Sequence, residues 1–424
     1  MRIELLTIGT ELLLGYTIDT NGAEIARRLA EAGTRVVRRT SVGDTGPEIS
    51  GAVMEALART GAVLCTGGLG PTRDDITKTA VAEALGLPLR FADWVWDDLL
   101  ERYRGLGRAP SDSNKLQAFV PEGAEVLRNK WGTAPGLWID SPKGLVVMLP
   151  GVPREMRKLL QHEVLPRLAQ RGDGVVIRSR TVRTTAIPES TLADRIGHVE
   201  RDIAPVTLAY LPGLEGVDLR LTAWDVPLGD ANQQLERAVA EVRARAGENV
   251  YAEEAVTLAE VVVTLLRRAG RRVAVAESCT GGLLGGRLTD VAGASAAFMG
   301  GVIAYDNAVK ERELAVPPAL IAGDGAVSEA VACAMAEGVR RRFATDYGVA
   351  VTGIAGPGGG TEAKPVGTVW FAVAGPGGTH GQKSVFPGSR YEIRARAVQT
   401  ALYLLLRDLR AAGVRDPDEA DCPA

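Results

Sequence analysis

Two long stretches of this sequence alternate short apolar runs with amphipathic segments, and this alternation restricts the fold more than any other feature. In the first stretch IELLTIG precedes NGAEIARRLAEAG, and AVLCTGGLG precedes DDITKTAVAEALGL. In the second, RVAVAESCTGG and YGVAVTGIAGPGGG each pass from an apolar run into a glycine-rich loop. Strands that alternate with helices predict a largely parallel sheet covered by helices on both faces. Many of the 50 glycines follow the apolar runs, where a backbone without a Cβ can approach a ligand closely.

The length of the chain and the changes in its pattern of apolar and glycine-rich segments predict three domains. At roughly 150 residues per domain, 424 residues suggest about three. We expect an N-terminal doubly wound, mostly parallel α/β domain at 1–170, a small α+β module at 171–252 and a C-terminal α/β domain at 253–415. Residues 416–424 are polar and interrupted by proline, so we expect them to fray.

The composition excludes several classes of protein. Lys and Arg number 49 against 52 Asp and Glu, and the net charge of −3 excludes a generally basic nucleic-acid binder. No apolar run approaches the roughly 18 residues that span a bilayer, so no membrane partner is expected. The four cysteines form no CxxC pair, which favours a reducing, cytoplasmic environment.

The middle module has the order strand, helix, two strands and helix. This arrangement resembles that of small RNA-binding KH modules. Because the chain as a whole is not basic, we expect a structural spacer here and no nucleic-acid partner.

The loop TGGLGPTRDDIT is the first candidate for chemistry. Its glycines (Gly67, Gly68 and Gly70) allow a bulky anion to approach, and Pro71 and Thr72 shape the turn. Asp74 and Asp75 follow at a helix start, where they either cap free N–H groups or hold a divalent cation beside a phosphate.

Neither a Walker A motif nor a complete GxGxxG is present, so a P-loop or Rossmann assignment does not fit. The loop after the first apolar run adds Glu11, Asp19 and Asn21. Loops at the carboxyl ends of parallel strands meet at one crevice, which predicts that these residues lie together.

The turn AESCTGG is the second candidate. Ser278, Cys279 and Thr280 lie on a sharp turn that Gly281 and Gly282 allow, either as a plain helix cap or as an exposed nucleophile with nearby N–H groups.

A serine nucleophile needs a base. No motif connects the three histidines to this turn, although His380 stays open as a base, and Cys279 stays open as a rival nucleophile. A desolvated lysine can act instead, and Lys310 in AYDNAVK is the candidate, with Tyr305 and Asn307 beside it.

The combination GTELLLGYTIDTN, TGGLGPTRDDIT and LPGVPREM resembles the molybdopterin-binding fold, in the version found in the CinA family. The resemblance implies metal-dependent ADP-ribose pyrophosphatase activity with Mg, Mn or Co. It also implies that Asp74 and Asp75 lie near the metal, with Glu11 and Asp19 as further acidic candidates. Gly67 to Thr72 would hold phosphate.

The C-terminal domain resembles the nicotinamide-nucleotide amidases of the same family through AESCTGGLLGGRLTDVAGAS, GGVIAYDNAVK, GAVSEAVACAMAEGVR, VTGIAGPGGGTEAKPVGTVW and FPGSRYEIRARAV. The resemblance implies deamidation of nicotinamide mononucleotide without a cofactor. The implied roles are nucleophile for Ser278, general base for Lys310, support for Tyr305, oxyanion region for Thr280 and Gly281, nucleotide site for Thr352 and Gly353, and phosphate partner for Arg390.

We therefore expect a bifunctional hydrolase of pyridine-nucleotide metabolism that acts on two small nucleotides. Three alternatives stay open: activity in only one half, molybdopterin binding with adenylyl transfer by the first domain, and a non-catalytic accessory role in competence or recombination. The resemblance also implies a homo-oligomer, with a dimer expected.

Overall fold

The computed structural model describes residues 1–105, 107–172 and 174–414, so the predicted tail at 416–424 lies outside the described residues. The chain forms two compact units. The first contains residues 1–178 and 222–234, and the second contains 179–221 and the chain from 235 onward.

The first unit is built on a six-stranded sheet of order β2-β1-β3-β8-β7-β6. β2, β1, β3 and β8 are parallel, whereas β7 and β6 are antiparallel additions at one edge. The strands are β1 (Arg2–Ile8), β2 (Arg35–Val42), β3 (Ala62–Thr66), β6 (Glu125–Leu127), β7 (Gly136–Ser141) and β8 (Gly144–Leu149). The predicted mostly parallel α/β sheet is confirmed.

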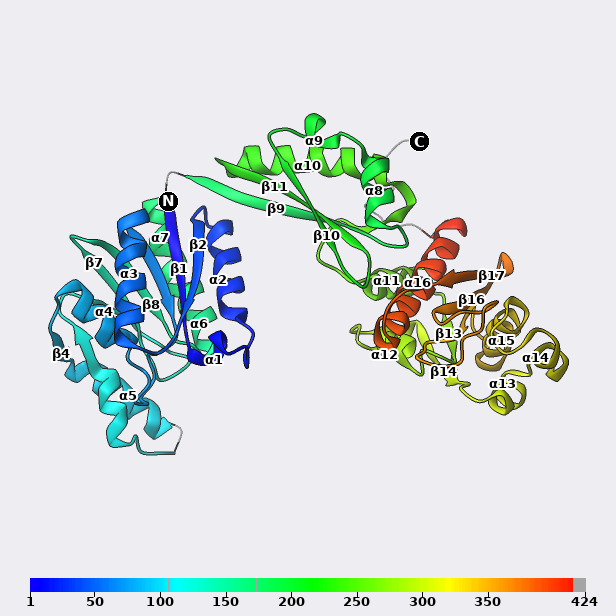
Figure 1. The fold of residues 1–424 in the computed structure, drawn as a ribbon, viewed down its shortest axis with the longest axis horizontal. Helices are drawn as coiled ribbons and strands as arrows, with labels where there is room; N and C mark the ends of the chain where they lie inside the picture. The colour runs from blue at the N-terminus through cyan, green and yellow to red at the C-terminus, as the bar shows by residue number, and fades with distance from the viewer. Residues whose placement is uncertain (106, 173, 415–424) are drawn as a thin grey trace. The chain divides into compact units, whose positions relative to one another are not determined.

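Helices cover both faces of this sheet (Figure 1). Ile3 and Leu5 of β1 face α2, α6, η2 and α7, whereas Leu6 and Ile8 face α3 and α4, because successive strand residues point to opposite faces. The helices are α2 (Thr20–Glu31), α3 (Gly46–Thr60), α4 (Thr77–Leu85), α6 (Pro153–Leu159), the π-helix η2 (Leu160–Val164) and α7 (Leu165–Arg171).

The shorter elements of this unit are α1 (Thr10–Leu13), the β4 and β5 pair (Leu89–Phe91, Phe119–Pro121), α5 (Asp93–Gly105) and the 3-10 helix η1 (Asp112–Ala118).

The parallel strands bring their carboxyl-end loops together. Thr7 pairs with Thr66, and Thr66 pairs with Leu149. The Thr66 hydroxyl donates to the Pro150 carbonyl (3.0 Å), which fixes the loop after β8 beside the loop after β3. Gly67 follows β3 with φ +110°, and a Cβ there would overlap the Ile8 carbonyl oxygen.

The middle module is a four-stranded sheet of order β10-β11-β9-β12 with helices α8 and α10. Its elements are β9 (Val175–Thr184), α8 (Glu189–Ile196), α9 (Val199–Asp202), β10 (Thr207–Pro212), β11 (Val217–Pro227), α10 (Leu228–Ala246), η3 (Gly247–Asn249) and β12 (Val250–Ala252). Within the second unit, the Gln399 amide of the C-terminal domain donates to the Thr185 hydroxyl (3.3 Å) and Arg410 donates to the Val250 carbonyl (3.1 Å).

The C-terminal domain has a five-stranded sheet of order β14-β13-β15-β16-β17, also covered on both faces. β14, β13 and β15 are parallel, and β16 and β17 are antiparallel. Helices α11, α12 and α16 pack on one face, and α13, α14 and α15 on the other. The strands are β13 (Val273–Glu277), β14 (Phe298–Ile303), β15 (Tyr347–Gly353), β16 (Thr368–Gly375) and β17 (Gly378–Val385). The helices are α11 (Leu258–Arg268), α12 (Leu283–Thr289), η4 (Ala294–Ala296), α13 (Asn307–Leu314), α14 (Pro318–Asp324), α15 (Glu329–Phe343) and α16 (Arg390–Ala411).

Across the described ranges, none of the helices combines the length and the apolar character needed to cross a membrane.

The close approach at Gly67 predicts a specific stability effect. Gly67→Ala should lower the free energy of unfolding of the first unit by roughly 2–5 kcal/mol, because it adds both left-handed backbone strain and overpacking. Gly86→Ala is the matched control: Gly86 also has a positive φ but nothing lies within 4 Å of a Cβ, so roughly 1–2 kcal/mol of strain alone is expected. Urea unfolding followed by tryptophan fluorescence reports chiefly on this unit, because five of the six tryptophans lie within residues 1–178 and 222–234. Equal losses in the two variants would contradict the steric argument.

Candidate active sites

The C-terminal sheet changes direction of winding at β13, which lies between β14 and β15 and is parallel to both. Glu277, the last residue of β13, pairs with Ile303 on one side and Val351 on the other. The Ser278 N–H donates to the Val351 carbonyl (2.9 Å), and the Ala304 N–H donates to the Glu277 carbonyl (2.7 Å). In open α/β sheets, ligands bind at such a switch point, outside the carboxyl ends of the strands.

The turn after β13 carries the predicted nucleophile. Ser278 is mostly buried, and its carbonyl accepts the Gly281 N–H (3.1 Å). Gly281 and Gly282 have φ of +59° and +95°, so both occupy backbone conformations that favour glycine. Thr280 is 0% exposed, and in the described chain its hydroxyl has no hydrogen-bond partner.

Two residues that sequence reasoning missed hold this turn. The Glu277 carboxylate is 1% exposed and accepts the N–H groups of Gly282 (2.9 Å), Leu284 (3.0 Å) and Gly285 (2.8 Å). Arg394 of α16 donates to the carbonyls of Cys279 (3.0 Å) and Thr280 (2.8 Å).

The sequence contains a signal for each of them. A glutamate ends an otherwise apolar strand at Glu277, and Arg394 lies four residues after Arg390, on the same side of a helix.

Lys310 lies inside the protein although lysine is rarely buried. It is 1% exposed, and its Nζ donates to the Tyr305 carbonyl (3.2 Å) and the Asn307 Oδ1 (3.4 Å). Within the described chain, no carboxylate forms an ion pair with it. Burial lowers the pKa of Lys310, and the negative charge of Asp306 opposes that shift in part.

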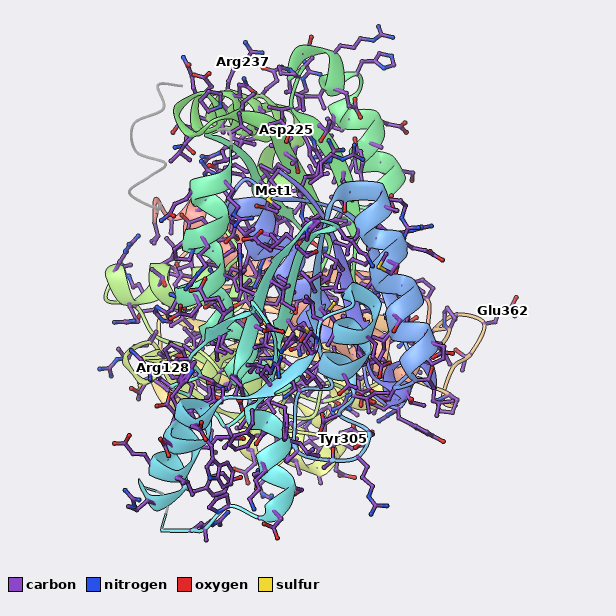
Figure 2. The ribbon with its side chains drawn as sticks, turned by 90° about the vertical axis from the view of Figure 1, so that its left-hand side faces the viewer. Met1, Arg128, Asp225, Arg237, Tyr305 and Glu362 are labelled. Carbon is purple, nitrogen blue, oxygen red and sulfur yellow. The ribbon has the colours of Figure 1, made fainter. Side chains whose placement is uncertain are left out.

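Tyr305 and Arg390 form a contact beside the buried lysine. The Tyr305 side chain is 59% exposed, and its hydroxyl accepts a hydrogen bond from Arg390 (2.9 Å). Figure 2 labels Tyr305 in the lower half of the view. Arg390 also donates to the Gly356 carbonyl in the GPGGG loop (2.7 Å). The Thr352 hydroxyl donates to the Ala326 carbonyl (2.8 Å), and Gly353 ends β15 beside it.

The rival nucleophile and rival base are less suited to this chemistry. Burial raises the pKa of Cys279 to about 12, so its thiol is protonated and poorly nucleophilic near neutral pH. His380 pairs with Asp408 (3.2 Å) and lies on β17, three strands from β13, a distance of roughly 14 Å at normal strand spacing. His162 belongs to the first unit, where it stacks on Trp131.

A pocket of about 170 Å³ lies at the carboxyl edge of the first unit's sheet and brings several predicted residues together. It is lined by Thr7, Ile8, Glu11, Leu12, Thr17, Ile18, Asp19, Thr20, Asn21, Thr66, Gly67, Gly151 and Pro153. Asn21 donates to the Gly151 carbonyl (2.7 Å), and its buried Oδ1 has no partner in the described chain. Asp19 accepts the Gly22 N–H (2.7 Å) and pairs with Arg39 (2.8 Å).

The rest of the glycine-rich loop lies outside the pocket lining. Asp75 accepts hydrogen bonds from the N–H (2.9 Å) and the hydroxyl of Thr72, and Gly70 packs against its carboxylate. The pKa of Asp74 is lowered by its own contact with the Thr72 side chain and by a hydrogen bond from the backbone. Gly68 has φ +66°, and Pro71 completes the turn before Thr72.

The pocket carboxylates of the first unit could hold a cation only if a bound substrate supplied further oxygen ligands. In the described ranges, no group of three His, Cys, Asp or Glu side chains is arranged to hold a metal ion. Glu11 and Asp19 nevertheless line one pocket. Magnesium typically takes one or two carboxylates and completes its shell with substrate phosphates and water. Glu11 fits such a shared site directly, whereas Asp19 would share oxygens that already accept from Gly22 and Arg39.

Three family models match successive parts of the chain. They are "Probable molybdopterin binding domain" over residues 4–170, "Damage-inducible protein CinA KH domain" over 179–252 and "CinA C-terminal domain" over 255–409.

Relatives match over nearly the whole chain. A CinA-like protein of Gemmatimonas aurantiaca is 52% identical over 411 residues, which are 96% of each chain. One of Parasynechococcus marenigrum is 45% identical over 378 residues, covering 89% of this chain and 90% of the relative. The crystal structure of competence/damage inducible protein CihA from Agrobacterium tumefaciens is 41% identical and covers 36% of this chain and 93% of its own, with a TM-score of 0.35. The chain belongs to the CinA family.

Proposed function

We propose that the C-terminal domain deamidates nicotinamide mononucleotide to nicotinic acid mononucleotide and ammonia. The buried Lys310 is the observation that carries this proposal. Its amine lies at a sheet switch point, contacts only neutral oxygens within hydrogen-bond distance, and is desolvated, so it can be neutral and accept a proton. A serine on the turn after the adjacent strand supplies the nucleophile.

The reaction is an acyl transfer. Lys310 takes the proton of Ser278 as the Oγ–carbon bond forms at the carboxamide, and the oxyanion meets backbone N–H donors of the turn. Protonated Lys310 then gives a proton to the leaving nitrogen as the carbon–nitrogen bond breaks and ammonia departs. Water hydrolyses the acyl enzyme and restores Ser278. The positively charged pyridinium ring makes the amide carbon more electrophilic.

The nucleotide part of the substrate is assigned to the neighbouring strand end. Thr352 and Gly353 end β15 beside the turn, and Asn307 and Tyr305 approach from β14. Arg390 already holds Tyr305 and the GPGGG loop, and its guanidinium has further N–H donors for a phosphate.

For the N-terminal domain we propose hydrolysis of the diphosphate of ADP-ribose. The pocket with Glu11, Asp19 and Asn21 supports this, because two carboxylates there suit a divalent cation shared with a diphosphate. A bound cation would neutralise the diphosphate and lower the pKa of an attacking water. Gly67 lines this pocket, and Asp75 keeps the Gly70–Thr72 turn in shape.

The amidase proposal predicts the behaviour of two variants. Ser278→Ala should abolish ammonia release from nicotinamide mononucleotide, and Lys310→Ala should reduce it at least ~10²-fold, the usual loss when a general base is removed. The assay is run with EDTA, so that the metal-dependent half is silent. Release by both the wild type and Ser278→Ala would mean that another group is the nucleophile.

The charge near Lys310 predicts the pH dependence. The neutral amine is the active form, so kcat should rise as Lys310 loses its proton, and its lowered pKa places that rise below the range of an ordinary lysine. Asp306 favours the ammonium form, so Asp306→Asn should move the rise to lower pH, while an Asn side chain can still cap α13.

Glu311→Gln, next to Lys310 in the chain, is the control and should leave the profile in place. The test is a pH profile of kcat for the wild type, Asp306→Asn and Glu311→Gln. A shift to higher pH in Asp306→Asn would rule out Lys310 as the base.

The pyrophosphatase proposal predicts separate failures in the two halves. Glu11→Gln should reduce ADP-ribose hydrolysis at least ~10²-fold, and a chelator should abolish it, because the cation contributes several kcal/mol. Asp75→Ala should reduce it as well, because the Gly70–Thr72 turn loses the hydrogen bonds that hold its shape. Ser278→Ala should keep full hydrolysis, as should Glu31→Gln, a half-exposed carboxylate at the end of α2. AMP release measured by chromatography tests this. Undiminished activity in chelator would refute the metal-dependent assignment.

A further inference from the structure

Glu277 presents an unusual arrangement for a carboxylate. It ends β13 with 1% exposure, and burial of a charged carboxylate is strongly unfavourable unless its oxygens are fully hydrogen-bonded. Here one oxygen accepts the N–H groups of Gly282 and Leu284, and the other accepts that of Gly285. A helix start at the protein surface can be capped by an exposed side chain, without burying a charge. The burial of the Glu277 carboxylate next to Ser278 therefore needs an explanation.

The other side of the turn is held by a cation. Arg394 donates to the carbonyls of Cys279 and Thr280, so the turn is fixed through its N–H groups by Glu277 and through its carbonyls by Arg394. The Gly281 N–H is engaged by the Ser278 carbonyl. Within the described chain, Thr280 is left with a backbone N–H and a fully buried hydroxyl that have no partner.

We propose that Glu277 is a positioning residue of the amidase reaction: together with Arg394 it holds the Ser278–Gly282 turn in the one conformation in which the Ser278 hydroxyl faces the carboxamide carbon and the Thr280 N–H faces the carboxamide oxygen. The inference rests on the proposed amidase function. Donors aimed in advance at the developing oxyanion stabilise a transition state because they need no reorganisation during the reaction. Glu277 touches no substrate and acts only through the turn.

The test compares two glutamates whose carboxylates both accept hydrogen bonds from backbone N–H groups at a helix start. Glu260 forms a capping box with Thr257 at the exposed start of α11, away from the turn. Glu277→Gln places an amide NH₂ against backbone N–H donors, so the turn loses part of its support. We expect kcat for nicotinamide mononucleotide to fall at least ~10-fold and KM to change less than ~3-fold. This loss is smaller than the ~10²–10³-fold fall in kcat when a whole oxyanion donor is removed. Glu260→Gln should leave both constants unchanged, even where its melting temperature falls.

A second readout does not depend on the substrate. An alkyl fluorophosphonate phosphonylates a reactive serine: the Oγ–phosphorus bond forms as the serine proton passes to the base, the phosphorus–fluorine bond breaks, and fluoride leaves. Labelling of Ser278, measured by peptide mass spectrometry on the full chain, should slow in Glu277→Gln by a factor similar to the fall in kcat. If Glu277→Gln does not fold, Arg394→Lys, which keeps the charge but loses the paired donation, should give the same pattern more weakly.

The outcomes separate the two proposals. Folded Glu277→Gln with wild-type kcat and labelling overturns the positioning role. Slow labelling in the variant, with no ammonia release even by the wild type, supports the positioning role and overturns the proposed substrate. A wild type that neither labels at Ser278 nor releases ammonia overturns both.

Discussion

The hydrogen bonds that join β13 to the strands on both sides are the constraint on which the C-terminal site depends. They align Glu277 with Ile303 and Val351, so the residues that follow these three lie at the same edge of the sheet. Ser278 follows one strand, Tyr305 follows another after a single intervening residue, and Thr352 and Gly353 end the third. Three segments far apart in the sequence are thus brought together by backbone pairing alone, before any side chain contributes.

The burial of Lys310 determines the energetics of the same site. An ammonium group inside a protein loses its hydration, and at Lys310 only a backbone carbonyl and an amide oxygen replace it within hydrogen-bond distance. Burial therefore shifts the equilibrium of Lys310 towards the neutral amine, and the negative charge of Asp306 opposes that shift in part. The proposed base must both accept a proton and return it, and these two opposing effects serve both steps.

The sequence predicted the parts that depend on local pattern and missed those that depend on tertiary contact. Alternating apolar and amphipathic segments fixed the α/β class, and Gly281 and Gly282 indicated a sharp turn after an apolar strand. Glu277 was overlooked because its three partners lie five to eight residues ahead, in a helix start whose orientation only the fold determines. Arg394 reaches the turn from more than a hundred residues away, and its spacing from Arg390 indicates only a shared side of a helix, not the carbonyls that it binds.

Both α/β sheets carry their candidate site at the carboxyl ends of parallel strands, but the charged groups at the two sites have opposite signs. The first presents the carboxylates of Glu11 and Asp19, where we propose a cation, whereas the second presents the buried amine of Lys310 and a serine on the turn after the neighbouring strand. In the proposed amidase reaction a pyridinium ring next to Lys310 acts in the same direction as burial, because a second positive charge further disfavours the ammonium form. Substrate binding then makes the base more available, and the negative charge that develops on the attacked oxygen offsets the proton as Lys310 receives it. A carboxylate base would be stabilised in its ionised form by the same ring, and would therefore be a weaker proton acceptor.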